Sequence, residues 1–449
     1  MKNTALRRLS ALCLCLCALL SLVSCEHKHK WNDWTPVDGT NHTRTCQSCE
    51  EAEVAAHHFD DGAITKEATD VDPGTKTYTC TDCGYTRTEE IPSLIQIIPE
   101  EFDEWDIHTT LQKRFLSDDP DNVNKYATGN SEISYPAVRT FNWEVTGVEK
   151  EQIDHYEFFI SEKEDLSDAV AQTTRYNDFS VAKGGQNLKV RTVYYWQAAV
   201  VLTDGRSVKS KICSFETLDG PRNLYVDGVA NVRDIGGKDC DGGILRQGLV
   251  YRCGRLHNSY SDYTTVKITK KGIETMLSWG IKTEIDLRGK ISGDYKENGS
   301  RVDGSFVFDK SVLGDTVTYY NFGATYSNTM LNGSEGKKMV KDTFEVLARP
   351  ESYPLCFHCS IGTDRTGIIA ILIEGVCGVN KEEIYYDYLF SNFGNIGSKR
   401  DHERWDGIMS TIECNAGANF MEKCNATLLK CGVTQAQIDA VRDILIEAE

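Results

Sequence analysis

The sequence lacks an excess of basic residues. Its 449 residues include 49 Lys and Arg against 67 Asp and Glu, which gives a formal net charge of −18 at pH 7. A protein that binds nucleic acid through the phosphates needs clustered positive charge to displace counterions. The acidic balance therefore excludes nucleic acid as a partner of the whole chain, and it leaves room only for a local phosphate pocket.

The apolar run at the N-terminus, residues 9–23, is short for a membrane-spanning helix. A basic start precedes this run, and Leu22-Val23-Ser24-Cys25 ends it. The pattern resembles the signal of bacterial lipoproteins, in which a cysteine receives lipid and becomes the new N-terminus. We therefore expect residues 1–24 to be a signal peptide and Cys25 to be the lipidation site. The protein would then be a membrane-anchored lipoprotein of the bacterial cell surface, facing the extracytoplasmic side. An ordinary secretory peptide and a single spanning helix are the alternatives.

Cysteine is abundant, with 17 residues in the chain. An export signal permits disulfides. If Cys25 carries lipid and the cysteines before it leave with the signal, an odd number of cysteines remains. At least one thiol is then unpaired or is used chemically.

The length of the chain predicts two to four domains. Composition divides it at residues 25–92, 93–218 and 219–449, and Asp219-Gly220-Pro221 provides a linker before the last part.

Residues 25–92 contain two imperfect repeats, each with a histidine, an aromatic residue, a turn, a Thr-rich strand and a C-x-x-C pair. They look like the short histidine and C-x-x-C repeats of bacterial surface proteins. A C-x-x-C pair presents two thiolates to one zinc ion, and imidazole can complete the tetrahedron. A segment this small also needs a staple to fold. We predict a structural zinc site from Cys46, Cys49, Cys80 and Cys83, with His29, His57 or His58 as substitutes. Disulfide-like pairs and a redox pair are the alternatives, and the second would require a βαβ setting that is not evident.

Residues 93–218 contain recurrent runs with the composition of β-strands, at 138–145, 155–160, 190–203 and 209–216. Phe141, Trp143 and Trp196 give the segment a pattern that resembles fibronectin type III domains. The resemblance implies a β-sandwich with these aromatic residues in its core. We assign no chemistry to this segment, which would serve as a spacer or a binding module.

Residues 219–449 alternate between helical and strand patterns. Residues 269–279 predict a helix that ends at Gly280, and residues 281–287 and 354–358 predict strands. Residues 366–377 predict a helix that is apolar on nearly all sides and therefore buried. The alternation is typical of an α/β fold with a mostly parallel central sheet.

The stretch His358 to Gly367 reads H-C-S-I-G-T-D-R-T-G and lies between the second of these strands and the buried helix. A short loop that enters a helix N-terminus presents backbone N–H groups and the positive end of the helix dipole to an anion. Arg365 offers a planar fork for two phosphate oxygens, and the same field would hold Cys359 as a thiolate. The phosphate would be bound by Ser360, Ile361, Gly362, Thr363, Asp364, Arg365 and Thr366. The alternative is a chance match in a cysteine-rich chain.

The H-C-x5-R-T-G stretch resembles the signature of the protein tyrosine phosphatase superfamily. Four further segments resemble motifs of a bacterial branch of it, in the same order along the chain: Asn231 to Gly237, Gly248 to Leu256, Ile285 to Arg288 and Asp387 to Asn392. The resemblance covers residues 219–449 and implies hydrolysis of phosphomonoesters through a phosphocysteine, without a catalytic cofactor. Cys359 would be the nucleophile and Arg365 the phosphate ligand.

The leaving group needs a proton, so a carboxylic acid must lie near the loop. Asp286, at the end of a predicted strand, is favoured over Asp364, which lies within the loop. Arg288 would form an ion pair with Asp234 or Asp286, and Arg233 and Asp234 could brace the loop. Thr363 stands where relatives that use phosphoinositides carry lysine, which disfavours multiply phosphorylated lipids.

We therefore predict a cell-surface phosphatase whose partner is a phosphotyrosine protein or a small phosphomonoester. Inositol phosphates are an alternative substrate class. A catalytically weak scaffold that only binds phosphate is the other alternative, and the intact Cys359 and Arg365 argue against it.

Overall fold

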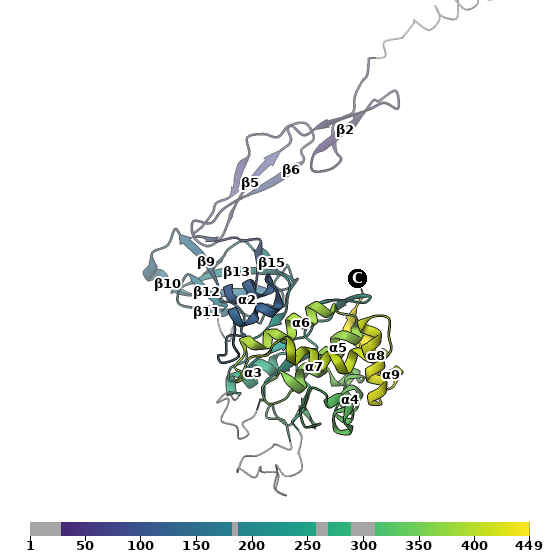
Figure 1. Cartoon of the computed structure of the whole chain (residues 1–449). Helices are drawn as coiled ribbons and strands as arrows, with labels where there is room; N and C mark the ends of the chain where they lie inside the picture. Colours follow the sequence, from purple (N-terminus) through teal and green to yellow (C-terminus); the bar gives the residue numbers. More distant parts are fainter. Residues whose placement is uncertain (1–27, 182–186, 257–267, 289–309, 449) are drawn as a thin grey trace, which may run out of the picture. The chain divides into compact units, whose positions relative to one another are not determined.

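The structure is a computed structural model that describes residues 28–181, 187–256, 268–288 and 310–448 (Figure 1). Contacts divide the chain into two compact units, one of Met1–Gln96 with Thr146–Glu149 and one of Ile97–Val145 with Lys150–Glu449. The predicted signal peptide and Cys25 lie outside the described residues. Within the described residues, no helix combines the length and the apolar character that crossing a membrane requires.

The first unit contains two three-stranded antiparallel sheets with the strand orders β1-β2-β3 and β4-β5-β6. Each repeat also has an equivalent isolated β-bridge. Trp31 pairs with Cys46 in the first repeat, and Phe59 pairs with Cys80 in the second. This equivalence agrees with the internal repeat seen in the sequence. The strands are β1 (Thr35–Pro36), β2 (Asn41–Thr45), β3 (Ala52–Ala56), β4 (Ala63–Lys66), β5 (Gly74–Thr79) and β6 (Thr86–Ile91).

The two repeats have almost no apolar core. Among the described residues in the range 28–92, the buried ones are His42, Cys46, His57, Gly74 and Cys80. Hydrophobic residues such as Val54 and Ile64 are exposed instead. Burial of apolar area therefore contributes little to the stability of this segment.

The second unit begins with a β-sandwich of two sheets. One sheet has the order β11-β10-β13-β15-β8 with β14 paired to β13, and the other has the order β12-β9-β7. Phe141 of the second sheet contacts Phe158 and Trp196 of the first, with ring centroids 4.8 and 5.0 Å apart. The strands are β7 (Gln96–Pro99), β8 (Glu104–Trp105), β9 (Arg139–Thr146), β10 (Ile153–Ser161), β11 (Gln172–Thr174), β12 (Asp178–Val181), β13 (Val193–Leu202), β14 (Ser207–Lys209) and β15 (Cys213–Thr217), with a 3-10 turn η3 (Lys150–Gln152). The aromatic residues lie in the core as expected, and the likeness to fibronectin type III domains stays a prediction.

A segment between β8 and β9 leaves the sandwich and packs on the C-terminal domain. It contains α2 (Thr110–Leu116), which begins with a capping box at Thr109, and the 3-10 helix η2 (Pro120–Lys125). Phe115 of α2 is fully buried against Tyr386, Phe390 and Phe393. The sequence range 93–218 therefore contains both the sandwich and a strap that belongs to the C-terminal core.

The strap also holds backbone of the C-terminal domain. The Glu132 carboxylate accepts hydrogen bonds from the backbone N–H groups of Asn231 (3.4 Å) and Asn395 (2.9 Å). The Ile133 N–H donates to the Phe393 carbonyl at 2.7 Å. Burial raises the pKa of Glu132 against these hydrogen bonds.

The C-terminal domain is built on a six-stranded sheet with the order β16-β17-β20-β23-β21-β22. Strands β20, β23, β21 and β22 are parallel, and β16 and β17 add an antiparallel edge. The predicted α/β domain with a mostly parallel sheet is thus confirmed. The strands are β16 (Arg222–Asn223), β17 (Arg233–Asp234), β20 (Val250–Cys253), β21 (Thr283–Asp286), β22 (Thr318–Asn321) and β23 (Leu355–His358), and a second small sheet contains β18 (Asp239–Cys240), β19 (Gly243–Leu245) and β24 (Ile446–Glu447).

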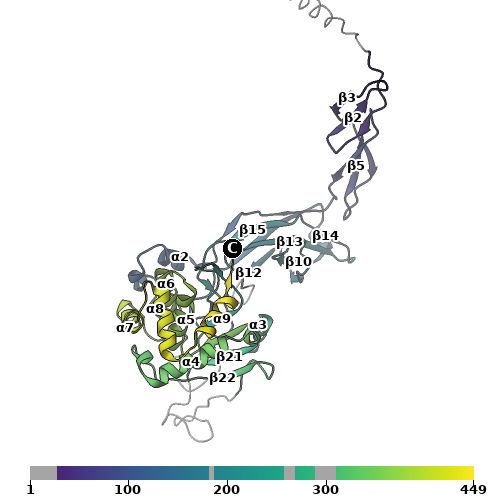
Figure 2. The same cartoon turned by 90° about the vertical axis from the view of Figure 1, so that its right-hand side faces the viewer.

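The two faces of this sheet bury different apolar clusters, because successive residues of a strand point to opposite sides. Leu355 and Phe357 of β23 belong to the large cluster that includes the helices α4 to α9, whereas Cys356 belongs to a smaller cluster with Met276 of α3. Figure 2 shows these elements from a second side. The helices are α3 (Lys270–Ser278), α4 (Ser334–Leu347), α5 (Asp364–Cys377), α6 (Lys381–Phe390), α7 (His402–Glu413), α8 (Phe420–Cys431) and α9 (Gln435–Leu445), with 3-10 turns η4 (Met330–Asn332), η5 (Pro350–Ser352) and η6 (Ser391–Phe393).

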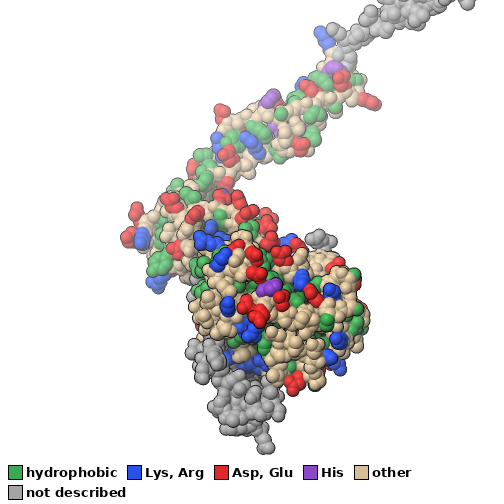
Figure 3. All heavy atoms as spheres, in the orientation of Figure 1, with side chains coloured by type: hydrophobic (Ala, Val, Ile, Leu, Met, Phe, Trp, Pro, Cys, Tyr) green, Lys and Arg blue, Asp and Glu red, His purple; other side chains and the backbone are tan. Residues whose placement is uncertain are grey.

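Acidic side chains are spread over the described surface drawn in Figure 3. This distribution agrees with the net charge of −18.

Candidate active site

The candidate site lies at the C-terminal end of β23, in the interior of the parallel sheet. Cys359 follows this strand directly, and residues 360–363 form a loop that leads into α5. Every residue of α5 from Thr366 to Cys377 is buried, which confirms the predicted apolar helix. The described residues provide no side-chain cap for its first turn. The first N–H groups of the helix are therefore available to an anion.

Cys359 is 2% exposed and borders the large apolar cluster. Burial alone would raise the pKa of its thiol, but the positive charge of Arg365 and the hydroxyl and N–H groups of Thr366 outweigh it, and the pKa of Cys359 is lowered. Among the described residues, the buried Thr366 Oγ1 has no hydrogen bond of ordinary geometry. Its effect on the thiolate is therefore that of a nearby dipole.

Arg365 is held by backbone carbonyls on one side. Its Nη1 donates to the carbonyls of Leu287 (3.3 Å), Arg288 (3.2 Å) and Ala324 (3.1 Å). Its Nε is buried and, among the described residues, has no hydrogen-bond partner. A buried donor without a partner is costly, so an anion bound at this point would restore a missing interaction.

Gly362 makes the turn of the loop with a φ of +71°. A Cβ atom here would lie 2.5 Å from the carbonyl carbon and oxygen of Cys253. Only glycine fits this close approach between the loop and β20.

The side chain of Thr363 points into the interior of the protein. Its side chain is fully buried, its Oγ1 accepts a hydrogen bond from Asn231 Nδ2 at 3.3 Å, and it donates to the Ile361 carbonyl at 3.4 Å. Among the residues predicted to bind phosphate, Thr363 therefore has only its backbone to offer to an anion.

Asn231 braces the loop, a role that the sequence did not reveal. It has a φ of +57°, and its Nδ2 also donates to the carbonyls of Ile361 and Gly362, both at 3.2 Å. Arg252 supports the same turn by donating to the Gly362 carbonyl at 3.1 Å. Hydrogen bonds from the side chains of Asn231 and Arg252 thus fix the backbone of the loop.

Asp387 joins these donors in a buried ionic network. Its carboxylate accepts from Arg233 Nε at 2.9 Å and also pairs with Arg252, and Arg233 in turn donates to the Asn231 amide oxygen. Burial opposes the ionised form, but Arg233, Arg252 and Lys238 outweigh it, and the pKa of Asp387 is well below its usual range. Arg233 thus supports the loop through Asn231. Asp234 instead pairs with Arg222 and accepts from the Gly236 N–H at 2.8 Å.

Asp286 is fully buried at the end of β21. Arg288 donates to it from Nε (2.9 Å) and Nη2 (2.7 Å), and Tyr319 donates its hydroxyl at 3.0 Å. Arg288 therefore forms one of its two predicted ion pairs. The pairing lies next to the backbone carbonyls of Leu287 and Arg288 that accept hydrogen bonds from Arg365.

Asp364 lies at the first position of α5, and its side chain is 15% exposed. Arg400 binds it with two hydrogen bonds of 2.8 Å. Its exposure distinguishes it from Asp286, because a proton donor must be reloaded from water.

His358, the residue before the nucleophile, is buried between two carboxylates. Its Nε2 lies 2.9 Å from Glu284 and its Nδ1 lies 3.9 Å from Asp286. Burial lowers the pKa of His358, but the two carboxylates outweigh it and the pKa is raised. This pairing ties the ends of β21 and β23 together beside the loop.

The predicted zinc ligands are not all in one place. The structure separates the two C-x-x-C pairs into the group His42, His57, Cys80, Cys83 and the group His29, Cys46, Cys49. The expected four-cysteine set is thereby corrected, because each pair lies in the turn between the second and third strands of its own three-stranded sheet. Of the histidines expected as substitutes, His29 and His57 join a group, whereas His58 is exposed and pairs with Asp82.

The strand, the cysteine loop and the buried helix define a cysteine-dependent class of enzyme with an anion-binding loop. Residues 224–447 match the model of the tyrosine phosphatase family, and this domain of the chain belongs to that family of hydrolases. Cysteine-based phosphatases of this family need no cofactor for catalysis.

Two relatives bear names of the same kind. Over 208 residues the chain is 25% identical to a protein of Cupriavidus necator that carries the name of a tyrosine-protein phosphatase, and the match covers 40% of this chain and 66% of that one. Over 147 residues it is 27% identical to a tyrosine-protein phosphatase of Nostoc commune, covering 30% and 49%. The chain thus spans between about half and two thirds of the length of these relatives.

Among solved structures, the core catalytic domain of the PP-IP phosphatase SIW14 from S. cerevisiae, in complex with citrate, is 14% identical. The match covers 37% of this chain and 91% of that chain, with a TM-score of 0.22.

Proposed function

We propose that the protein is a phosphotyrosine-type phosphomonoester phosphatase with Cys359 as its nucleophile. The observation that carries this proposal is the lowered pKa of Cys359 at a loop whose Arg365 keeps a buried donor without a protein partner. A thiolate and an open guanidinium donor beside a helix N-terminus suit a phosphate dianion.

The reaction follows from these positions. The phosphate oxygens accept hydrogen bonds from the loop N–H groups and from Arg365. The Cys359 thiolate then attacks phosphorus in line, the S–P bond forms and the bond to the ester oxygen breaks. The leaving oxygen takes a proton from a carboxylic acid. Water next attacks the phosphocysteine, releases inorganic phosphate and regenerates the thiolate.

We assign the proton transfer to Asp364 and not to Asp286, which the sequence favoured. Asp364 is next to Arg365 and is partly exposed, whereas Asp286 is fully buried and bound to Arg288 and Tyr319. In this assignment Arg400 must release the Asp364 carboxylate, which then takes up a proton from water and gives it to the leaving oxygen.

The substrate class follows from what surrounds the phosphate. Thr363 brings no positive charge into the loop, because threonine is uncharged, and its side chain is buried against Asn231. A second or third phosphate on the substrate would lack a cation at this position, so a singly phosphorylated aryl ester such as phosphotyrosine fits best. With Cys25 as a lipid anchor, the enzyme would act on extracytoplasmic substrates at the bacterial surface.

The test is the hydrolysis of a series of aryl phosphates by the full chain, in EDTA and reductant. We expect activity in the wild type and none above background in Cys359→Ser. Asp364→Asn should reduce kcat by about 10²–10⁴-fold for esters with poor leaving groups and much less for nitrophenyl phosphate, since a good leaving group needs no proton.

Asp286→Asn serves as the matched carboxylate change. We expect its loss to be similar for all leaving groups, because it would act by displacing Arg365. A dependence on leaving group in Asp286→Asn, and none in Asp364→Asn, would reverse the assignment. Wild-type protein that binds phosphate but hydrolyses neither aryl nor inositol phosphates would overturn the proposed function.

A further inference from the structure

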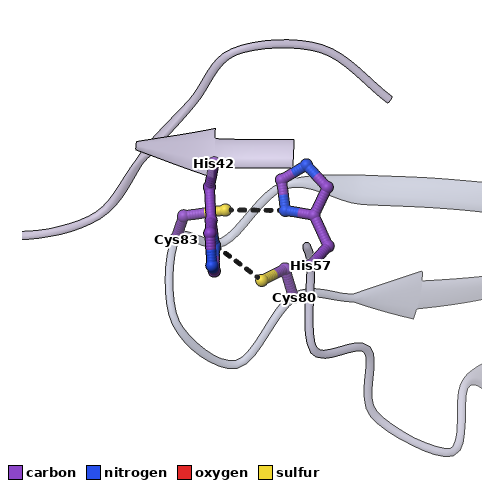
Figure 4. A group of neighbouring side chains, drawn as sticks. All are labelled: His42, His57, Cys80 and Cys83. Atoms are coloured by element: carbon purple, nitrogen blue, oxygen red, sulfur yellow. Dashed lines mark hydrogen bonds between the residues drawn. The ribbon is translucent and has the colours of Figure 1, made fainter. Parts of the chain in front are cut away.

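The first unit contains a group of four side chains with metal-ligand chemistry, three of them buried and Cys83 half-buried, drawn in Figure 4. His42 comes from β2 of the first repeat. His57, Cys80 and Cys83 come from the second repeat, at its entry and after β5. One ligand atom from each of these residues lies within 4.8 Å of the others. The group therefore connects the two repeats.

The distances fit one tetrahedral ion. Cys83 Sγ lies 3.3 Å from His57 Nδ1, and Cys80 Sγ lies 3.6 Å from His42 Nδ1. With Zn–S near 2.3 Å and Zn–N near 2.0–2.1 Å, neighbouring sulfur and nitrogen ligands of tetrahedral zinc are roughly 3.6 Å apart. Two thiolates and two neutral imidazoles also balance the charge of Zn²⁺, which permits burial.

The outer contacts orient the histidines for this role. His57 Nε2 lies 3.0 Å from the Asp38 carbonyl, so this nitrogen carries the proton and Nδ1 presents its lone pair to the group. Tyr85 stacks on His57 with ring centroids 4.7 Å apart, and Trp34 stacks on His42 at 4.1 Å. Each of the two histidines is thus packed against an aromatic ring.

The segment has little else to stabilise it. His42, His57 and Cys80 are three of the five buried residues in the range 28–92 that the structure describes. A segment of this size without an apolar core needs a covalent or metal crosslink.

We propose that His42, His57, Cys80 and Cys83 bind one structural Zn²⁺ ion that joins the two repeats. On binding, each thiol loses its proton to solvent and the four protein ligands close the coordination sphere. The ion takes the place of the missing core, so the segment folds only when loaded.

In the part of the chain that the structure describes, the second group, His29, Cys46 and Cys49, has one ligand fewer than the four of a complete tetrahedral site. Cys49 Sγ lies 3.5 Å from His29 Nδ1, which is the same arrangement as Cys83 with His57. Within the described residues this group has three members, and no counterpart of His42 joins it. His42 is contributed to the four-member group by the preceding repeat, and within the described residues no such donor joins the three-member group.

The experiment measures zinc in the full chain, purified without chelator, by elemental analysis, and then measures the visible absorption after exchange with Co²⁺. All chains carry Cys49→Ser to remove the three-member group. We expect one equivalent of zinc and the spectrum of a tetrahedral S₂N₂ cobalt site. His42→Ala and Cys80→Ser should lose this equivalent, whereas His58→Ala, which changes the exposed neighbour of His57, should keep it.

Hydrolysis of aryl phosphate by each variant shows that the C-terminal domain is still folded, and protease digestion of residues 28–92 reports on the repeats. A zinc content that is unchanged in both His42→Ala and Cys80→Ser would overturn the proposal. A zinc-free Cys49→Ser parent chain with a Cys80–Cys83 disulfide, seen as a crosslinked peptide by mass spectrometry, would overturn it as well.

Discussion

The N-terminal repeats and the C-terminal domain use the same residue, cysteine, in opposite ways. In the repeats, Cys80 and Cys83 lie beside imidazole nitrogens. In the C-terminal domain, Cys377 and Cys424 are buried among apolar side chains, and burial raises the pKa of Cys377 to about 12. Cys359 is a third case, because a guanidinium and a helix N-terminus reverse the effect of burial. The neighbours of a cysteine, and not the abundance of cysteine, decide its chemistry.

The two regions also differ in what replaces or supplements the apolar core. The C-terminal domain has a large apolar cluster and, within it, charged residues such as Arg233 and Asp387 that hold the catalytic loop. The repeats have a group of four potential ligands, and a second group of three, in place of a core. Chelation should therefore affect only the first region, and loss of a buried charge should affect only the second.

Chelation should give the largest effect. Treatment of the full chain with a strong zinc chelator should unfold residues 28–92, because the proposed ion would supply most of their stability. Hydrolysis of aryl phosphate should be unchanged. Limited proteolysis with mass spectrometry, beside the activity assay, measures both. Return of protection after added Zn²⁺ is the control, and a parallel loss of activity would contradict the separation of the two regions.

Asp387→Asn should destabilise the C-terminal domain by about 3–5 kcal/mol, because Arg233 and Arg252 would keep uncompensated buried charge. Urea unfolding measures this change. Asp439→Asn, on the exposed surface of α9, should change the free energy of unfolding by less than about 0.5 kcal/mol.

The Asp387 carboxylate should also make the stability of the C-terminal domain depend on pH. The pKa of Asp387 is lowered in the folded chain, so its contribution is fully present above its unfolded pKa of about 4 and is lost as pH falls through the folded value. The deficit of Asp387→Asn should therefore be constant near neutral pH and should shrink in strong acid. A deficit that grew on acidification would contradict this sign.

Gly362→Ala should reduce kcat strongly and cost about 1–3 kcal/mol of stability, because the new Cβ would overlap the backbone of Cys253. Gly280→Ala is the matched change, since Gly280 also has a positive φ, +75°, with nothing within 4 Å of a Cβ. We expect it to cost about 1–2 kcal/mol and to leave kcat unchanged. Equal effects of the two changes on kcat would show that the geometry of the loop at Gly362 does not determine the rate.

Thr366→Val should give the smallest effect, a rise of less than about one unit in the pKa of Cys359, because the hydroxyl dipole is only one of the groups that lower it. The pH dependence of iodoacetamide alkylation, followed at the Cys359 peptide, measures this pKa. Cys424 is fully buried and should stay unmodified in both proteins, which makes it the internal control. An unchanged alkylation profile would remove Thr366 from the electrostatics of the thiolate.

Much of the C-terminal domain could be predicted from the sequence. The helix at 269–279 begins at its Thr269 cap, and the strand, loop and buried helix around Cys359 lie where the local pattern indicated them. These features depend on neighbours in the chain. The support from Asn231 could not be predicted, because it depends on contacts with residues about 130 positions away.

In the repeats, too, the sequence could predict ligands that lie within one repeat but not the one that the other repeat contributes. The spacing of C-x-x-C identified Cys80 and Cys83 as candidate ligands, but His42 joins them only because β2 and the turn after β5 lie together. The choice between Asp286 and Asp364 likewise needed their exposure and partners, which spacing does not contain.

The strap between β8 and β9 has a consequence for how such a protein can be inherited and recombined. A fragment cut at residue 219, where the sequence places its linker, would uncover Phe390 and Phe393 and would remove the Glu132 carboxylate from the Asn231 backbone. The C-terminal domain is therefore not a unit that can be transferred without the strap. A gene fusion that transferred it alone would leave behind part of the scaffold of its own active site, and the sandwich must be exchanged together with it.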